Sequence, residues 1–396
     1  MARRVLLHVG CPKTGTSFLQ GVLWGSRDAL AEQGLVVPLS YNHHYRASLF
    51  VRENWQQRTA AEGIESAWRQ LQRAVQEAEH DVVISHETLA AATESQASRA
   101  IEAFGGAETH VVVTARDLAR QLPAEWQQSV KQGSVHRLDD FVHDVVHRGP
   151  RANWFWRVQD LPDIVQRWGA TLPPDRVHVV TVPPKGADPS ALWTRFASVL
   201  GVDPDSCDLH RTRSNESLGS VEVELLRRIN ESRDDRFPIR ANHRWFKNLL
   251  ANEILAQRPG KDRFAVAEET HEWVCDTARR MVEMLREQGC DVVGDLDDLL
   301  PPPVADVGAN PGQVSDAALL QSAIDTVLDL LDEHRGRVER LERWRGVAVS
   351  RGRQVAELEA RQQRFGRPEW LEWPRLGARA RAALGRIRRG IGPRGG

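Results

Sequence analysis

The stretch from Gly10 to Ser17 combines two glycines, one lysine and three hydroxyl side chains within eight positions. Glycine lets a backbone curl tightly and approach a ligand closely. Where a helix begins at the end of such a stretch, its first N–H groups point toward an anion. Lys13 adds a positive charge that does not depend on backbone geometry. These residue types at this spacing predict a phosphate-binding loop.

The order of residues inside the loop departs from the Walker A pattern, G-x-x-x-x-G-K-[ST]. Gly10, Gly15 and Ser17 fit that pattern, but Thr16 stands at the lysine position and the loop lysine comes three residues earlier. P-loop nucleoside triphosphatases place the Walker lysine on the β and γ phosphates. The displaced lysine therefore favours another phosphate-bearing donor, and an ATP- or GTP-dependent P-loop kinase is the alternative.

The elements that must hold this loop follow from hydrophobic patterning. The apolar run Val5–Val9 predicts a buried strand, and an amphipathic helical pattern continues from the loop to about Gln33. Further strand patterns, separated by helical ones, occur at residues 34–38, 81–85, 110–115 and 176–182. Strands alternating with helices predict an α/β fold, here a P-loop-like, doubly wound parallel sheet flanked by helices. Residues 291–300 are expected to form a short acidic connection.

The segment Pro12–Ser17 resembles the 5′-phosphosulfate loop of the sulfotransferases, whose pattern is roughly P-K-[ST]-G-[TS]-[TS]. The preceding strand and the following helix fit the same family. The resemblance implies 3′-phosphoadenosine 5′-phosphosulfate (PAPS) as donor and sulfuryl transfer to an acceptor hydroxyl or amine, without a metal ion. It implies that the donor is held by Lys13, Thr14, Gly15, Thr16 and Ser17, with Lys13 stabilising charge on the leaving phosphate oxygen.

Arg116 follows the strand pattern at 110–115 and matches the arginine with which sulfotransferases hold the donor's 3′-phosphate. A planar guanidinium binds a phosphate through two parallel hydrogen bonds, so one arginine can carry most of that contact. The alternative for Arg116 is an ion pair with Asp117. The family usually has a serine eight residues later, where this chain has Ala124. Residues expected to compensate are Arg120, Ser129 and Lys131.

A polar, basic loop at residues 211–219 resembles, in position and chemistry, the late loop that closes over the donor in sulfotransferases. That resemblance implies a donor contact from Arg213, although the R-K-G-x-x-G signature of the cytosolic enzymes is absent. The alternative is the capped start of the following helix.

The predicted base is His44, which follows His43 in what the sequence suggests is a polar connection. Histidine can accept a proton from a hydroxyl near neutral pH. His86 and Glu87 are rival candidates, because they follow the strand at 81–85 and ligands collect at the carboxyl ends of such strands. The alternative role for this second pair is to cap the next helix.

The acceptor is predicted from a stretch that mixes aromatic and polar residues, Pro150 to Asp160. Aromatic faces bind sugar rings and other flat apolar ligands, and an aspartate can bind a hydroxyl. The expected acceptor is a small molecule, a carbohydrate or a lipid, and the aromatic stretch favours a glycan or glycolipid. The alternative is that the stretch only anchors the following helix.

Composition narrows the class of protein. With 396 residues, 41% hydrophobic and 27% charged, the chain is ordinary for a globular protein, and its net charge of -1 argues against a nucleic-acid partner. The four cysteines lack disulfide or metal-ligand spacing, which suggests a reducing, cytoplasmic setting. No apolar run is long enough to span a bilayer, and no signal peptide is evident.

The expected organisation is a catalytic domain at 1–303, a linker at 304–314, a helical extension at 315–365 and a basic tail at 366–396. The extension has apolar residues at helical spacing, with interruptions expected near Gly346 and Gly352; it packs back on the domain, pairs with a second copy of the chain or flexes. The tail has seven arginines after residue 374 and no acid, so it contacts an anionic membrane surface, binds an anionic glycan or is disordered. These C-terminal features leave a further alternative, a non-catalytic scaffold with a vestigial donor site.

Overall fold

The computed structural model describes residues 1–54, 61–209, 217–233, 237, 242–260, 262, 264–301 and 310–365. The chain forms two compact units, Met1–Val327 and Leu328–Gly396. The boundary between them lies inside helix α14 (Asp316–Phe365) rather than near residue 303. Most of the predicted linker and all of the predicted basic tail lie outside the described residues.

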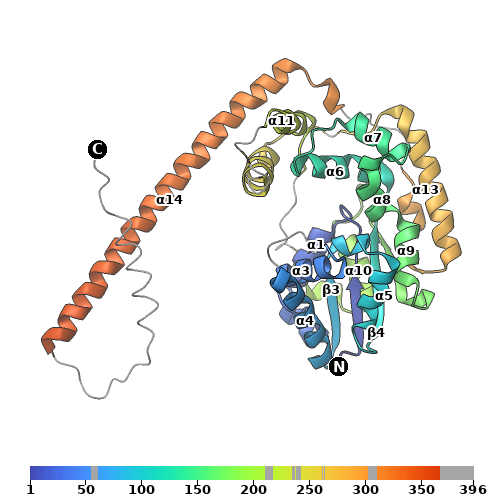
Figure 1. The fold of residues 1–396 in the computed structure, drawn as a ribbon, viewed down its shortest axis with the longest axis horizontal. Helices are drawn as coiled ribbons and strands as arrows, with labels where there is room; N and C mark the ends of the chain where they lie inside the picture. Colours follow the sequence, from blue (N-terminus) through green and yellow to red (C-terminus); the bar gives the residue numbers. More distant parts are fainter. Residues whose placement is uncertain are drawn as a thin grey trace. The chain divides into compact units, whose positions relative to one another are not determined.

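The first unit is built on one sheet of six parallel strands, in the order β2-β3-β1-β4-β5-β6 (Figure 1). The strands are β1 (Arg4–His8), β2 (Leu35–Val36), β3 (Asp81–Ser85), β4 (Glu108–Ala115), β5 (Val177–Thr181) and β6 (Asp291–Val293). Parallel pairing is continuous across the sheet, and helices cover both faces. The predicted α/β architecture is therefore confirmed.

The strand order places β1 between β3 and β4, with Leu7 opposite Ile84 on one side and Val111 on the other. From β1 the chain runs out to the edge strand β2, and from β3 it crosses over β1 to β4. In open α/β sheets ligands bind at the carboxyl ends of strands where the order reverses in this way. The loops after β1, β3 and β4 therefore define the place to look for a site.

Alternate residues of each strand enter different cores, as the two-residue period of a strand requires. Leu6 packs with α1 (Thr16–Gly25), α2 (Arg27–Glu32) and α10 (Ala191–Leu200) on one face. Leu7 packs on the other face, which is covered by α4 (Ala61–Glu77), α5 (Glu94–Glu102), α9 (Leu161–Gly169) and part of α13 (Glu268–Gln288). The sheet is thus a central layer between two layers of helices.

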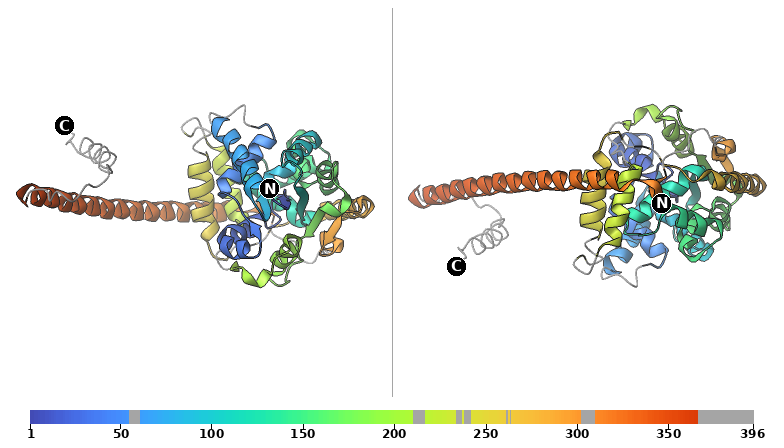
Figure 2. Two further views of the ribbon diagram at one scale, coloured as in Figure 1. Left: turned by 90° about the horizontal axis from the view of Figure 1, so that it is seen from below. Right: turned by 90° about the horizontal axis from the view of Figure 1, so that it is seen from above.

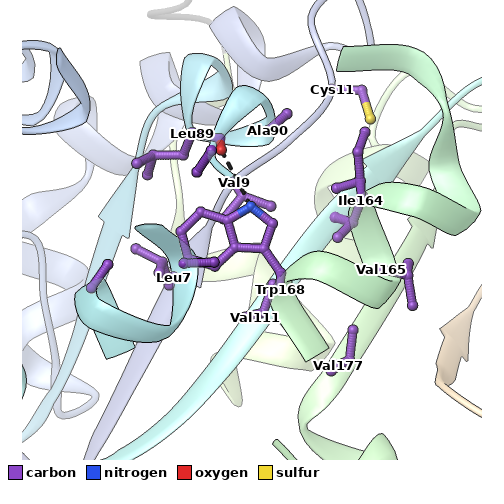
Figure 3. Close-up of a cluster of buried hydrophobic side chains, with 14 of the residues drawn as sticks. Leu7, Val9, Cys11, Leu89, Ala90, Val111, Ile164, Val165, Trp168 and Val177 are labelled. Atoms are coloured by element: carbon purple, nitrogen blue, oxygen red, sulfur yellow. Dashed lines mark hydrogen bonds between the residues drawn. The ribbon is translucent and has the colours of Figure 1, made fainter. Parts of the chain in front are cut away.

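Trp168 of α9 lies at the centre of the second core (Figure 3). Its indole packs among aliphatic side chains of β1 and β4, and its Nε1 donates a hydrogen bond to the Leu89 carbonyl at 3.2 Å. Leu89 belongs to the short 3-10 helix η1 (Glu87–Ala91) that follows β3. This packing fixes the segment at the carboxyl end of β3, which carries Glu87.

A third core lies mainly between helices. It joins α6 (Leu118–Lys131), α7 (Leu138–Val146), α8 (Asn153–Gln159), α11 (Ser220–Glu231), the π-helix η6 (Asn242–Ile254), the first part of α13 and Leu319 of α14. Another helix, α3 (Tyr41–Val51), packs against α4. Since α6 begins directly after β4, the helical core is connected to the carboxyl edge of the sheet.

Two local expectations are wrong. Residues 291–293 form strand β6, which pairs with β5, because a parallel edge strand needs only a few residues when its neighbour supplies the hydrogen bonds. In the C-terminal region, α14 continues through Gly346 and Gly352 without the expected interruption (Figure 2). A single glycine inside a helix costs only about 1 kcal/mol, which a long helix tolerates.

Candidate active site

The loop between β1 and α1 owes its shape to three left-handed residues. Gly10, Lys13 and Gly15 have φ of 55°, 66° and 82°. A Cβ at Gly15 would lie 2.4 Å from Leu192 Cδ2, so a side chain there would collide with α10. Helix α1 begins at Thr16, and no side chain among the described residues caps its N-terminus. The loop therefore presents an uncapped helix end, which attracts anions.

Thr14 fastens this loop to the sheet. Its hydroxyl donates to the Cys11 carbonyl at 2.6 Å and lies 2.6 Å from the Thr114 hydroxyl of β4. Thr114 in turn lies 3.3 Å from His8 Nε2, and His8 Nδ1 lies 2.8 Å from the Ser85 hydroxyl of β3. This buried polar chain connects the ends of three neighbouring strands, so the Thr14 side chain shapes the loop and faces inward.

Lys13 is half-buried and held by helix α6. Its Nζ donates to Gln128 Oε1 at 2.7 Å. Burial lowers the pKa of Lys13, while the nearby Glu125 carboxylate acts in the opposite direction. The charges of Glu87, Lys247 and Arg116 also act on this ammonium group, which places Lys13 at the centre of a cluster of charged side chains.

Arg116 lies at the end of β4, beside the loop. Its Nη1 donates to the Lys13 carbonyl at 3.1 Å, and its buried Nε has no hydrogen-bond partner among the described residues. Burial, together with the charge of Arg120, lowers the pKa of Arg116 to about 10. Asp117 instead caps α6 and pairs with Arg120. The guanidinium of Arg116 is thus directed at the loop, with one donor unused.

The residues expected to replace the missing serine at Ala124 make other contacts. Lys131 Nζ donates to Asn252 Oδ1 at 3.1 Å, and the Ser129 hydroxyl donates to the Trp126 carbonyl at 2.7 Å. Arg120 pairs with Asp117, yet it is close enough for its charge to act on Arg116. Arg213, the other predicted donor contact, lies outside the described residues.

The predicted base, His44, is a buried residue of α3 and not part of a polar connection. Its Nδ1 accepts a hydrogen bond from the Ser85 backbone N–H at 3.1 Å, and its Nε2 lies 2.7 Å from the Pro38 carbonyl. Burial lowers the pKa of His44 to about 4. Because both ring nitrogens bond to the backbone, neither is available to an acceptor, and the geometry argues against His44 as base.

The two rival candidates for the base, His86 and Glu87, make different contacts after β3. His86 Nδ1 accepts from the Thr88 backbone N–H at 3.2 Å and so caps η1. Glu87 accepts from Gln20 Nε2 of α1 at 3.1 Å, and its charge acts on Lys13. Burial acts to raise the pKa of Glu87, but the charge of His86 and hydrogen bonds hold it below its usual value. Glu87 is therefore a carboxyl group held against α1, with its charge acting on Lys13.

Sequence reasoning missed Glu125, a buried carboxyl group of α6. Its Oε1 accepts from Gln159 Nε2 at 3.4 Å, and the same Nε2 donates to the Pro12 carbonyl at 3.0 Å. Burial raises the pKa of Glu125 to about 7, although the charge of Lys13 opposes this shift. A signal was present, because Gln121, Glu125 and Gln128 form a polar stripe at helical spacing after Arg116.

The predicted acceptor stretch is divided between core and surface. Trp156 is buried, with its Nε1 donating to the Val145 carbonyl at 3.0 Å. Trp154 is exposed beneath the Arg52 guanidinium. Asp160 is paired with Arg148 at 3.4 Å. These contacts make most of the stretch a helix anchor.

Comparisons with known proteins add little to this geometry. A search of protein-family models finds no match, and no curated protein matches the chain. Among solved structures, the chain is similar to a sulfotransferase domain from the curacin biosynthetic pathway, with 15% sequence identity and a TM-score of 0.27 over 51% of this chain and 74% of that one. The likeness is weak, so the fold assignment rests on the strands and helices themselves. No helix in the described part of the chain is both long and apolar enough to cross a membrane.

Proposed function

We propose that this protein is a sulfotransferase that uses PAPS as donor. The observation that carries the proposal is that Arg116 binds the Lys13 carbonyl in the loop before the uncapped α1, while its buried Nε has no partner in the described part of the chain. Two cations and a helix end in one place suit a ligand with several anionic groups. A donor that carries both a 5′-phosphosulfate and a 3′-phosphate has such groups.

The loop and Arg116 would divide the donor between them. The 5′-phosphosulfate fits the helix N-terminus, where Thr16 and Ser17 open the first turn and Lys13 supplies charge. The unpaired Nε of Arg116 suits the 3′-phosphate, because a guanidinium binds phosphate through two donors. Thr14 and Gly15 keep the loop in the required shape.

Sulfuryl transfer needs one group that stabilises the leaving oxygen and another that accepts the acceptor's proton. The acceptor oxygen or nitrogen attacks sulfur, the bond from sulfur to the bridging phosphate oxygen breaks, and negative charge develops on that oxygen. Lys13 would stabilise this charge by donating a hydrogen bond. The acceptor's proton would pass to Glu87, an ionised carboxylate near Lys13 that replaces His44 in this role. The products are the sulfated acceptor, adenosine 3′,5′-bisphosphate and a proton.

The proposed acceptor class is supported by the aromatic rings around His86, the neighbour of Glu87. Tyr41 and Tyr45 lie with their ring centroids 5.4 and 5.2 Å from His86. Flat aromatic faces beside a carboxylate suit a sugar ring that presents a hydroxyl or an amine. We therefore keep a glycan or glycolipid as the proposed acceptor, bound near α3 rather than at Trp154.

The first experiment is calorimetric titration of the full chain with adenosine 3′,5′-bisphosphate, ADP and ATP, each with and without Mg²⁺. We expect metal-independent binding of the bisphosphate, weakened about 10- to 100-fold in Arg116→Ala, since the variant loses charge-assisted hydrogen bonds. Arg69→Ala is the control, because Arg69 is exposed on α4 and forms an ion pair with Glu65 of the same helix. Preference for ATP with Mg²⁺ would instead support the kinase, and binding of none of the three the scaffold.

A further inference from the structure

Helix α14 carries an exposed apolar stripe along its length. The stripe follows one pattern of alternating four- and three-residue steps, and its large apolar members are Leu320, Ile324, Val327, Leu331, Val338, Leu341 and Val355. Each of these side chains is between 39% and 64% exposed. The remaining positions of the pattern hold His334, Arg345, Ala348 and Gly352. Alternating steps of four and three define the a and d positions of a coiled coil.

The other face of α14 accounts for the contacts that its first turns make. Leu319, Ser322 and Thr326 are buried. Arg258 donates to the Ser322 hydroxyl and the Thr326 hydroxyl, both at 2.8 Å. The start of the helix is therefore fixed by a face that excludes the stripe, and Leu320, Ile324 and Val327 stay exposed.

A single unpaired helix that exposes this apolar stripe to water has little stability of its own. Helices in water gain most of their stability by packing an apolar face, and large exposed apolar patches mark interaction sites. Three glycines inside α14, Gly336, Gly346 and Gly352, each make an isolated helix less stable than alanine would. Trp344, beside the stripe, is 70% exposed. These features call for a partner along most of the helix.

We propose that α14 pairs with α14 of a second copy of this chain in a parallel two-stranded coiled coil. With Leu331 and Val338 at a and Leu341 at d, Arg337 takes a g position and Glu342 the following e position. In parallel pairs the g residue of one helix faces the e residue five positions later on the other. Two-fold symmetry then forms the Arg337–Glu342 contact twice, beside the Arg337–Glu333 ion pair within each helix, so the surface complements itself in charge.

Polar residues within the seam fix its alignment. His334 and Arg345 take a d and an a position, where polar side chains specify register at a cost in stability. Trp344 at g flanks Arg345 and can cover its guanidinium. The pairing does not depend on the enzymatic activity proposed above.

The test is the mass of the full chain by light scattering after size exclusion, over a wide range of concentrations. We expect a dimer for the wild type and for Ser350→Glu, which changes the outer f position of the same helix. Leu331→Glu and Leu341→Glu should be monomers, because each places a charge in the seam. A thermal scan shows whether each variant keeps the cooperative unfolding of the wild type.

The charge contact gives a second, independent test. Arg337→Glu alone and Glu342→Arg alone should each weaken the dimer, and the double variant should restore it, since the reversed pair attracts again. A monomeric wild type, a trimer, or a dimer that survives both leucine substitutions would overturn the proposal. So would a double variant weaker than both single variants, because the parallel register requires compensation.

Discussion

Lys13 combines a left-handed backbone with a charged side chain that is partly withdrawn from water. A residue other than glycine in that conformation costs about 1–2 kcal/mol, and such strain gathers at functional sites. The strain turns the Lys13 carbonyl to Arg116 while its Nζ reaches Gln128. One residue thus joins the loop to both β4 and α6.

Replacing Lys13 with alanine should reduce turnover at least about 100-fold, since the charge on the leaving oxygen loses its donor. The rate is measured as release of adenosine 3′,5′-bisphosphate from PAPS with a panel of glycan acceptors. Lys185→Ala is the control, because Lys185 is an exposed lysine between β5 and α10. A Lys13→Ala enzyme with nearly full rate contradicts the proposed role.

Glu87 and His44 should respond differently to substitution. Glu87→Gln should lower kcat about 100-fold or more and leave bisphosphate binding intact, because only the proton acceptor is lost. His44→Ala should instead cost about 1–3 kcal/mol of stability, because it leaves the Ser85 N–H without its partner. Urea denaturation separates the two effects. If His44→Ala folds normally but loses activity while Glu87→Gln keeps it, His44 is the base after all.

Glu125 should give the protein a pH-dependent stability with a defined sign. Its folded pKa of about 7 lies above the ordinary 4.5, so folding favours the protonated form. The stability it contributes is complete below pH 4.5 and is lost as pH rises through 7. From pH 5 to pH 8, the Tm of the wild type should therefore fall relative to the Tm of Glu125→Gln. A difference that is constant over this range contradicts the assignment.

At the scale of elements, the strand, loop and helix around Lys13 could be predicted because an apolar run, a stretch with two glycines and an amphipathic pattern follow one another in the sequence. β6 could not, since three residues carry no period and its pairing depends on β5. His44 was misjudged because its neighbours are polar, whereas its burial depends on β3 far along the chain. Glu125 was missed because its surroundings depend on how α6 packs beneath the loop.

Gly15 offers a test of the loop as an element. Gly15→Ala should destabilise the protein and weaken bisphosphate binding, because a Cβ at φ 82° also meets Leu192 at 2.4 Å. Gly105→Ala is the matched control, with φ 66° and no atom within 4 Å of the added Cβ. Both variants should lose about 1 kcal/mol of stability because alanine disfavours a left-handed backbone. The additional loss of stability in Gly15→Ala therefore measures the clash with Leu192. Leu192→Ala should relieve part of that excess, and equal losses at both glycines would exclude the clash.

At the scale of the whole molecule, the start of α14 belongs to the first unit although the sequence suggested an end near residue 303. Leu319 is buried in the helical core, and Arg258 bonds to Ser322. A chain ending after residue 330 should therefore be monomeric and unfold at a higher temperature than one ending after residue 303. Equal Tm values for the two truncations would show that the first turns of α14 add nothing.

The Pro12 carbonyl accepts hydrogen bonds from both Gln121 of α6 and Gln159 of α8. The loop is thus fastened to the helical core as well as to the sheet. Proteins open in cooperative units, and amide hydrogen exchange reports the free energy of each opening. An anion bound at α1 should therefore slow amide exchange in α6, a helix that begins a hundred residues later.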